Sequence, residues 1–191
     1  MAESDADKWN ARYANAESTD TEPIPFLSEH ITGLGTGRAL VLAAGRGKNA
    51  VYLAEQGFEV TALDVSSVGL LLCAALAESR GVPLTTLCAD LDNHDLGESQ
   101  YDLITKFYFY EPTLFPLIRA ALRPGGHFIF QTFSKNHANV GTFGPRNPAY
   151  LSDRKTVRSA FQSDDILMCE EVTLSEDDDT ESVIQMLVRR T

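Results

Sequence analysis

Two glycines and one aspartate stand at a spacing that suits nucleotide binding. Gly45 and Gly47 follow the apolar run at residues 38–43, and Asp64 closes a second apolar run about 20 residues beyond the first glycine. Glycine has no side chain, so a ligand can approach the backbone of such a turn closely. A carboxylate at the next strand's end can accept hydrogen bonds from both ribose hydroxyls. These residues predict a nucleotide site; an ordinary glycine turn with a solvated aspartate is the alternative.

The elements that must position these residues follow from hydrophobic periodicity. Residues 38–43 are predicted as a buried strand, residues 48–56 as a helix that ends at Gly57, and residues 59–63 as a second strand. A helix that starts at the glycine turn presents free N–H groups and a partial positive charge. The sequence therefore predicts a strand–helix–strand unit with Asp64 at the tip of its second strand.

Predicted strands and helices continue to alternate beyond this unit. Ser66 is a predicted helix cap. The elements expected after it are a helix through Arg80, a strand at 84–89, a strand at 101–106, a helix at 112–122, a tight turn at 123–126 and a strand at 127–133. Alternation of this kind predicts a parallel sheet with helices on both of its faces.

The pattern changes in the last third of the chain. Residues 134–151 form a polar stretch with two prolines and two glycines, which predicts a long loop, and a helix capped by Ser152 is expected to run to about Phe161. Residues 166–174 and 181–189 are predicted strands, and the short acidic connection makes them an antiparallel hairpin. The predicted fold class is α/β, a Rossmann-like three-layer sandwich with a mostly parallel seven-stranded sheet and an antiparallel carboxyl-terminal hairpin.

Composition limits the classes of partner and the number of domains. The 191 residues are 43% hydrophobic, which predicts a single domain with a substantial core. The formal net charge of −11 disfavours nucleic acid and anionic membranes as partners, and no apolar run approaches the roughly 18 residues of a membrane span. The expected parts of the domain are a helical cap at 1–33, a ligand-binding core at 34–133, and a loop, helix and hairpin at 134–191.

The cysteines and the amino terminus bear on the compartment. Cys73, Cys88 and Cys169 are scattered and odd in number, and no CxxC pair is present, which argues against a disulfide framework or a zinc site. We expect three buried, reduced cysteines and no metal. The first residues are polar and acidic, unlike a signal peptide. Together these features predict a cytoplasmic protein.

An aromatic pair lies near the start of the chain. Trp9 and Tyr13 are four residues apart, so a helix would place both rings on one face, with Arg12 adjacent. This face either docks the segment on the core or covers the mouth of the ligand site, and both roles are compatible.

Several sequence blocks occur together in a fixed order. They are WNARY from Trp9, LAAGRGKNAVYLAEQGFEVTALD from Leu42, ADLD from Ala89, YDLITKF from Tyr101, LRPGGHFIFQTF from Leu122 and GTFGPRNPAYLS from Gly141. In these blocks the chain resembles the class I S-adenosylmethionine-dependent methyltransferases, most of all the small tellurite-resistance and thiopurine S-methyltransferase group. The resemblance implies S-adenosyl-L-methionine as cofactor and methyl transfer to a small-molecule acceptor by in-line displacement on the sulfonium methyl. It also implies a monomer or weak homodimer.

The resemblance assigns cofactor contacts along the chain. Asp64 is expected to bind the ribose hydroxyls, Asn49 to orient the amino-acid end, and Asp90 to accept a hydrogen bond from the adenine amine, unless it caps a turn instead. Lys106 is expected beside the sulfonium, with a solvated strand end as the alternative. The full set of implied cofactor-binding residues is Trp9, Arg12, Ala43, Ala44, Gly45, Gly47, Asn49, Asp64, Val65, Asp90, Leu91, Lys106 and Phe107.

The first strand departs from the family pattern. Val41 and Ala43 stand where family members usually carry an acid and a glycine. Loss of a hydrogen bond to a charged group costs about 1.5–3 kcal/mol, or one to two decades in affinity. Arg12 or Lys106 would then be available to hold the ligand carboxylate. The departure also motivates a second hypothesis, a binding module that retains the cofactor site without turnover.

The catalytic group depends on the acceptor, which the sequence does not identify. A soft anion needs no general base, whereas a neutral oxygen or nitrogen acceptor does. The candidate bases are Tyr108, Tyr110, Glu111 and His137, the last with a solvated loop position as its alternative, while Arg146 is a candidate for attracting an anionic acceptor. A nicotinamide-dependent oxidoreductase is the other class considered, although the turn lacks the third glycine of that motif.

Overall fold

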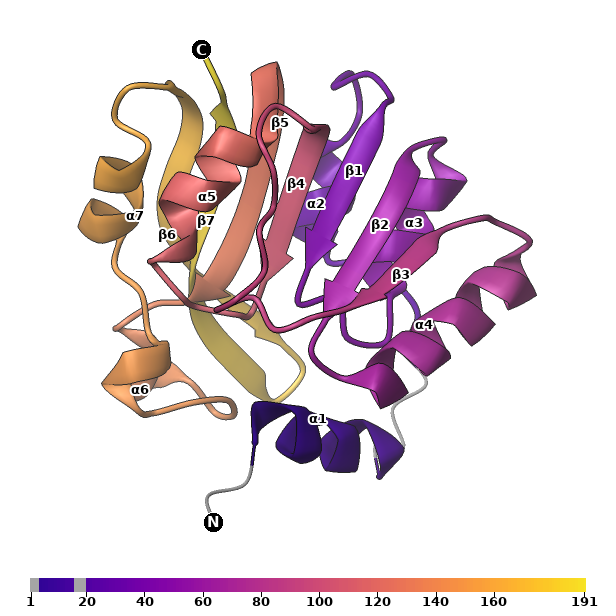
Figure 1. Cartoon of the computed structure of the whole chain (residues 1–191). Coiled ribbons are helices and arrows are strands. Elements are labelled where there is room, and N and C mark those ends of the chain that lie inside the picture. Colours follow the sequence, from indigo (N-terminus) through magenta and orange to yellow (C-terminus); the bar gives the residue numbers. More distant parts are fainter. Residues whose placement is uncertain (1–3, 16–19) are drawn as a thin grey trace. The chain divides into compact units, whose positions relative to one another are not determined.

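The computed structural model describes residues 4–15 and 20–191 (Figure 1). Residues 1–3 and 16–19 of the predicted helical cap lie outside the described residues. The chain divides into two compact units. The first consists of Met1–Asp95 and Tyr101–Thr105, and the second of Leu96–Gln100 and Lys106–Thr191. The prediction of a single domain stays a prediction.

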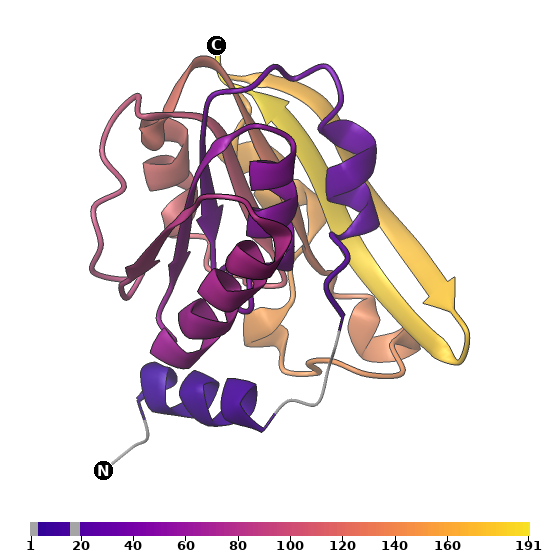
Figure 2. The ribbon, with the colours of Figure 1, turned by 90° about the vertical axis from the view of Figure 1, so that its right-hand side faces the viewer.

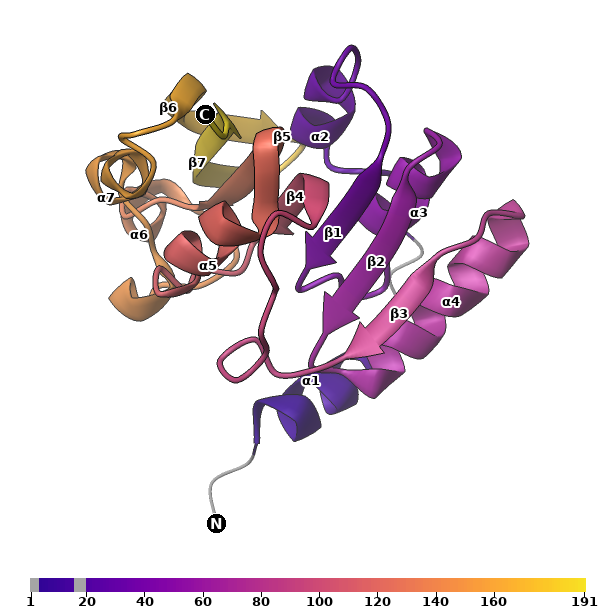
Figure 3. The ribbon, with the colours of Figure 1, turned by 45° about the horizontal axis from the view of Figure 1, so that its top comes forward.

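The first unit contains the predicted strand–helix–strand element. Its helices and strands are α1 (Asp5–Ala14), α2 (Pro25–His30), β1 (Arg38–Leu42), α3 (Lys48–Glu55), β2 (Glu59–Asp64), α4 (Ser67–Arg80), β3 (Thr85–Cys88) and most of β4 (Tyr101–Phe107). The strands β1, β2 and β3 pair in parallel, with Leu40 opposite Thr61 and Ala62 opposite Thr86. Figure 3 shows these three strands side by side, with α4 alongside β3.

Burial and capping explain the first unit's elements. The apolar residues of β1 from Ala39 to Leu42 are all buried, as a parallel strand covered on both faces requires. The Ser66 side chain accepts a hydrogen bond from the Gly69 N–H, which confirms it as the cap of α4. At the other end Gly81 has a φ of +68°, the left-handed conformation in which glycine ends helices.

The second unit contains the antiparallel part of the fold. Beyond the end of β4 it comprises α5 (Leu114–Ala121), β5 (Leu122–Phe133), α6 (His137–Val140), η1 (Pro148–Tyr150), α7 (Arg154–Ala160), β6 (Asp165–Glu176) and β7 (Asp179–Arg189). Strand β7 pairs antiparallel with both β5 and β6. Four buried phenylalanines pack together in its core: Phe115, Phe128, Phe130 and Phe161.

The strand order confirms the predicted fold class. Among the described residues the strands form one seven-stranded mixed sheet in the order β3-β2-β1-β4-β5-β7-β6. The carboxyl-terminal hairpin supplies its antiparallel strands, as predicted. No helix in the described part of the chain is long and apolar enough to cross a bilayer.

Several predicted boundaries were wrong for identifiable reasons. Residues 123–126 were predicted as a tight turn, but they begin β5, because Gly125 donates its N–H to Arg190 O and Gly126 O accepts from Arg190 N. The cap of α7 is Asp153 rather than Ser152, whose N–H donates to Phe133 O.

Three further differences concern the hairpin, the loop and a cysteine. The hairpin turn consists of residues 177–178, so both strands are longer than predicted. The segment 134–151 contains the short helices α6 and η1. Cys88 is exposed rather than buried, because β3 presents mostly exposed positions, whereas Cys73 and Cys169 are buried as expected and all three thiols are free.

Candidate functional site

The turn after β1 has left-handed backbone at three positions. The φ angles are +53° at Ala43, +55° at Gly45 and +87° at Gly47. Gly47 is also the cap residue of α3, so the turn leads directly into that helix. Only glycine adopts such angles without steric cost, which explains the two glycines and makes Ala43 a strained position.

Asp64 ties the tip of β2 to this turn. Its Oδ2 accepts a hydrogen bond from the Gly45 N–H at 2.7 Å, and its Oδ1 accepts from the Ser66 N–H at 2.8 Å. The residue is 5% exposed. Burial raises the pKa of its carboxyl, and hydrogen bonds from the backbone N–H groups of Ser66, Gly45 and Val65 partly oppose that shift. A carboxylate has about four acceptor positions, so acceptor capacity remains for ligand hydroxyls.

Helix α1 covers the glycine turn. A Cβ built on Gly45 would lie 2.7 Å from Tyr13 Oη, and one built on Gly69 would lie 3.0 Å from the Tyr13 ring. Burial and the nearby Asp64 raise the pKa of Tyr13 to about 12. Figure 2 shows α1 across the end of α4. The predicted docking of the aromatic face on the core is therefore confirmed within this unit.

Polar and aromatic contacts fix α1 in this position. Asn10 Oδ1 accepts from Ser66 Oγ at 2.7 Å and from the Val68 N–H at 3.2 Å, next to the start of α4. The Trp9 ring stacks on Tyr13 at 5.7 Å between centroids, and the Arg12 guanidinium lies 5.1 Å from the Trp9 ring centre. Trp9 is half-buried and Arg12 is exposed.

Other predicted cofactor contacts already have protein partners. Asn49 is buried and its Oδ1 accepts from the Ile24 N–H at 2.9 Å, so it anchors the start of α2. Asp90 caps a turn, because its two oxygens accept from the Asp92 N–H and from Asn93 Nδ2. Leu91 is buried. Ala44 donates its N–H to Leu63 O, and Val65 is half-buried.

Lys106 is the most enclosed charged residue predicted for the site. Its side chain is fully buried, and Nζ donates to Glu111 O at 3.1 Å. The ammonium lies 4.7 Å from the Phe115 ring centre and 5.4 Å from that of Phe130, within cation–π range. Burial lowers the pKa of Lys106 to about 7. The alternative of a solvated strand end was therefore wrong, and Phe107 beside it is also buried.

Tyr108 follows β4 in a strained conformation. Its φ is +53°, and its Oη donates to Glu181 Oε1 at 2.7 Å while accepting from Gln131 Nε2 at 2.7 Å. Burial raises the pKa of the phenol. The Glu111 carboxylate accepts from the N–H and Oγ1 of Thr113. Tyr110 is half-buried.

His137 and Arg146 hold the segment after β5. His137 is buried, so the alternative of a solvated loop histidine was wrong. Its Nδ1 accepts from the Ser182 N–H at 3.2 Å, which leaves Nε2 protonated to donate to Phe143 O at 2.7 Å. Arg146 donates from Nη1 to Ala138 O and from Nη2 to Gly141 O. Both side chains bond backbone groups of this segment, and His137 also bonds Ser182 of β7.

Sequence reasoning missed a polar group inside the second unit. Gln131 and Gln185 lie opposite each other on β5 and β7, and Gln131 is buried. Glu181 precedes the buried part of β7. A buried amide within an apolar strand is a signal that the sequence offered, because such groups need partners.

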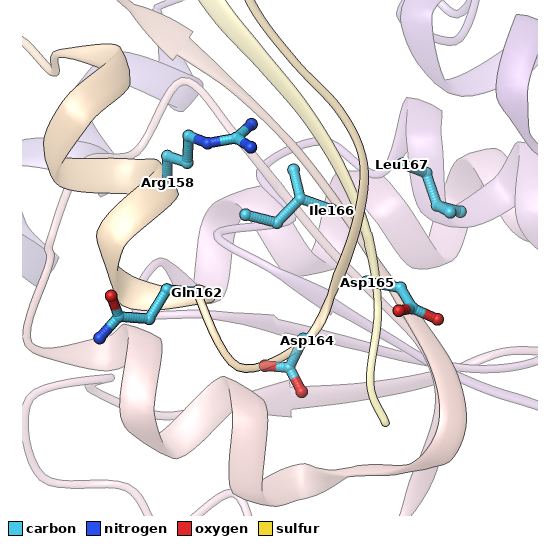
Figure 4. Close-up of a pocket in the computed structure, with 6 residues that line it drawn as sticks. All are labelled: Arg158, Gln162, Asp164, Asp165, Ile166 and Leu167. Carbon is cyan, nitrogen blue, oxygen red and sulfur yellow. The ribbon is translucent and has the colours of Figure 1, made fainter.

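A separate pocket in the second unit is lined by two carboxylates that are already paired with arginines. Figure 4 shows six residues that line this 430 Å³ pocket: Arg158, Gln162, Asp164, Asp165, Ile166 and Leu167. Asp164 is bonded to Arg119 at 2.7 and 3.0 Å, and Asp165 to Arg189. The pocket shares no residue with the predicted site. In the described residues no cluster of His, Cys, Asp and Glu is placed to hold a metal ion.

Comparison with known proteins finds one matching family model and several similar sequences. The family model described as "Methyltransferase domain" matches residues 39–126, a stretch that includes the glycine turn and Asp64. The ubiquinone biosynthesis O-methyltransferase of Vibrio vulnificus is 32% identical over 119 residues, covering 59% of this chain and 51% of the relative. That of Proteus mirabilis is 28% identical over 117 residues, covering 58% and 48%. The chain thus spans about half the length of the curated relatives it matches.

Solved structures share the fold over nearly the whole chain. One, from a study of the conversion of a disulfide bond into a thioacetal group during echinomycin biosynthesis, has a TM-score of 0.76 and 20% identity, covering 97% of this chain and 91% of that chain. TehB from Haemophilus influenzae has a TM-score of 0.75 and 16% identity, covering 97% and 67%. Magnesium protoporphyrin IX methyltransferase from Synechocystis PCC 6803, solved with bound SAH, has a TM-score of 0.64 and 16% identity, covering 86% and 80%.

Proposed function

We propose that this chain, which resembles the class I S-adenosylmethionine-dependent methyltransferases in sequence and fold, transfers a methyl group from S-adenosyl-L-methionine to a small-molecule acceptor. The observation that carries the proposal is the bond from the Gly45 N–H to the Asp64 carboxylate, inside the stretch that matches the methyltransferase model. This bond joins the backbone turn and the ribose acid that such a site requires. The match to the methyltransferase model does not favour the alternative of a nicotinamide-dependent oxidoreductase.

The first unit supplies the groups for holding the cofactor. Bound there, S-adenosylmethionine would supply an activated sulfonium methyl. Asp64 keeps acceptor capacity for the ribose hydroxyls, and Val65 and Leu91 offer apolar surface to the adenine. The Asp90 carboxylate already caps a turn, but it keeps acceptor capacity for the adenine amine. Helix α1 covers the glycine turn, so it can exclude water there.

The changed first strand affects affinity more than fold. Val41 is buried in β1 and supplies no acceptor for the ammonium of the methionine moiety. Arg12 is exposed beside Trp9, so its guanidinium is available to bind the carboxylate of the methionine moiety. Lys106, in contrast, is enclosed by aromatic rings. We therefore expect weaker cofactor binding than in relatives that retain the acid, by one to two decades.

Ligand identification is the direct test of this function. Mass spectrometry of the purified chain is expected to find S-adenosylmethionine or its demethylated product, and calorimetry is expected to measure binding of both. Binding of NADH in their place would overturn the proposal. A screen of thiols, phenols, chalcogen oxyanions and planar heterocycles would then identify the acceptor. Cofactor binding without transfer to any of them would favour the non-catalytic binding module.

Oligomeric state and location belong to the same proposal. We propose a monomer or weak homodimer, and a cytoplasmic location agrees with the three free thiols of the described residues. Size-exclusion chromatography with light scattering measures the first property. Fractionation of the native host measures the second.

A further inference from the structure

A directed chain of hydrogen bonds runs through the second unit to a carboxylate. Gln185 Nε2 donates to Gln131 Oε1 at 2.8 Å, Gln131 Nε2 donates to Tyr108 Oη at 2.7 Å, and Tyr108 Oη donates to Glu181 Oε1 at 2.7 Å. Because Gln131 uses its oxygen to accept from Gln185, its nitrogen must face the phenol. The phenol proton therefore points to Glu181.

Two energetically unfavourable features coincide where this series of hydrogen bonds ends. Tyr108 has a φ of +53°, and its N–H donates to Gln131 O at 2.8 Å, which holds the backbone in place. Glu181 Oε2 is buried and has no hydrogen-bond partner among the described residues. Strained residues and unsatisfied polar atoms concentrate at functional sites, where catalysis rather than stability requires them.

Tyr108 is also accessible from outside. The residue is 38% exposed, and its ring packs against Phe133 at 4.9 Å between centroids. A phenol oxygen has two lone pairs, of which Gln131 occupies one. The second lone pair can accept a hydrogen bond from a hydroxyl group of a bound molecule. Tyr108 also follows directly after the carboxyl end of β4, where ligands bind in open α/β sheets.

We propose that Tyr108 and Glu181 form a proton relay that serves a methyl acceptor with a neutral hydroxyl group. The inference rests on the proposed methyltransferase function and extends it to the acceptor's chemistry. Tyr108 is the catalytic residue that contacts the acceptor. Glu181 receives a proton through Tyr108, and Gln131 is a positioning residue that orients the phenol.

The proton and electron movements balance within the relay. The acceptor O–H proton moves to Tyr108 Oη while the Tyr108 proton moves to Glu181 Oε1, so the tyrosine ends as it began. With S-adenosylmethionine bound, the acceptor oxygen would use its freed electron pair to bond the methyl carbon, and the pair of the broken C–S bond would stay on sulfur. The protonated Glu181 returns its proton to solvent by the reverse path after product release.

The electrostatics agree with this division of roles. Burial raises the pKa of Tyr108, so the phenol stays protonated at neutral pH and cannot itself be the resting base. Burial also raises the pKa of Glu181, which makes it a better proton acceptor than a surface glutamate. The ionisable groups that face Glu181 are Tyr108 and, from α6, His137. The residue opposite it on β6 is Leu174, which does not ionise.

The first experiment separates hydroxyl from thiol acceptors. In Tyr108→Phe and Glu181→Gln, kcat/KM for phenolic acceptors is expected to fall by about 100-fold or more, the usual effect of losing a general base. For thiols at a pH where they are ionised, we expect less than about a threefold change because the nucleophile needs no base. Tyr150→Phe and Glu171→Gln, at exposed positions, are matched controls. Equal losses on both acceptor types, no loss on phenols, or methylation of thiols alone by the wild type would overturn the relay.

A second readout does not require turnover. Infrared difference titration of the intact chain without cofactor should show a carboxyl group with a raised pKa that is absent from Glu181→Gln and displaced in Tyr108→Phe. A titration unchanged by either variant would overturn the relay. Calorimetry with S-adenosylhomocysteine on the same variants distinguishes the two proposals. Failure of the wild type to bind it counts against the methyltransferase function, whereas normal binding with unchanged phenol turnover counts against the relay alone.

Discussion

Asp64 and Glu181, one carboxylate in each unit, are held in different ways. Backbone N–H groups of Gly45 and Ser66 hold both oxygens of Asp64. Glu181 has one oxygen on the Tyr108 hydroxyl and one buried without a partner among the described residues. Both backbone donors to Asp64 belong to one strand–helix–strand unit, so they fix the carboxylate once β1 and β2 have paired. Glu181 depends on a side chain 73 residues away, so it is fixed only when the second unit has folded.

This difference separates a binding group from a reacting group. Satisfied backbone contacts make Asp64 a fixed acceptor of hydrogen bonds, which suits recognition of a ribose. Burial raises the pKa of both carboxyls, but Glu181 also has an oxygen without a partner among the described residues, which suits it to gain and lose a proton in a catalytic step. Changes at these and neighbouring positions are expected to range from a large to a small loss in stability or in cofactor affinity.

The largest effect is expected where backbone conformation builds the first unit's site. A Cβ on Gly47, at a φ of +87°, would overlap the Cys73 side chain and lie 2.9 Å from the Cys73 Cα. Gly47→Ala should cost about 3 kcal/mol or more in the free energy of unfolding. The matched control is Gly81→Ala, also left-handed but with nothing within 4 Å of its Cβ, which should cost about 1–2 kcal/mol. Urea unfolding measures both, and equal costs would contradict the packing argument.

Lys106 gives the next largest effect, and it depends on pH. Its folded-state pKa of about 7 lies below the ordinary 10.5, so the folded state disfavours the charged form. Above pH 7 the Lys106 amine therefore takes up a proton when the protein unfolds. The free energy of unfolding of the wild type should then rise between pH 7 and about 10 by roughly 2–5 kcal/mol. Lys106→Met should be more stable than the wild type at pH 7 and should lack this rise.

Unfolding across that pH range tests Lys106 against an exposed lysine. Lys155→Met, on the surface of α7, should retain the wild-type dependence. A rise of the same size in Lys106→Met would show that another group causes it.

The comparison of the two carboxylates predicts that only one of them affects cofactor binding. Asp64→Asn removes the charge and one acceptor oxygen, so affinity for S-adenosylmethionine should fall about tenfold or more. Glu181→Gln should leave that affinity within about twofold, because Glu181 is proposed to act on the acceptor. Calorimetry of the two variants side by side is the measurement. Similar losses would mean that the two carboxylates do not have separate roles.

The smallest effect is expected at the contact between α1 and α4. Asn10→Ala removes the acceptor for Ser66 Oγ and the Val68 N–H and should cost about 1 kcal/mol in stability. Asn15→Ala, which removes an exposed contact to Ala11 O, should cost less. Thermal unfolding followed by the fluorescence of Trp9, the single tryptophan, measures both. A larger loss in Asn15→Ala would contradict the assigned contact.

Local patterns in the sequence predicted the parts of the fold that depend on neighbours along the chain. The glycine turn, α3 and Asp64 follow one another within a single strand–helix–strand unit, so spacing alone predicted their positions. Ser66 was predicted as a cap from its residue type, and its bond to the Gly69 N–H spans only three residues. Residues 123–126 were misassigned because their backbone partner is Arg190, at the far end of the chain.

The sequence by itself determined the order of strands and helices, the conformation of the glycine turn and the acid at the tip of β2, since periodicity and short-range hydrogen bonds act between near neighbours. Only the tertiary structure enclosed Lys106 among rings, occupied both nitrogens of His137 and directed Tyr108 to Glu181. Tyr108 and Glu181 are 73 residues apart, and their contact exists because β7 pairs between β5 and β6. Burial and proton affinity depend on such pairings, which no local pattern specifies.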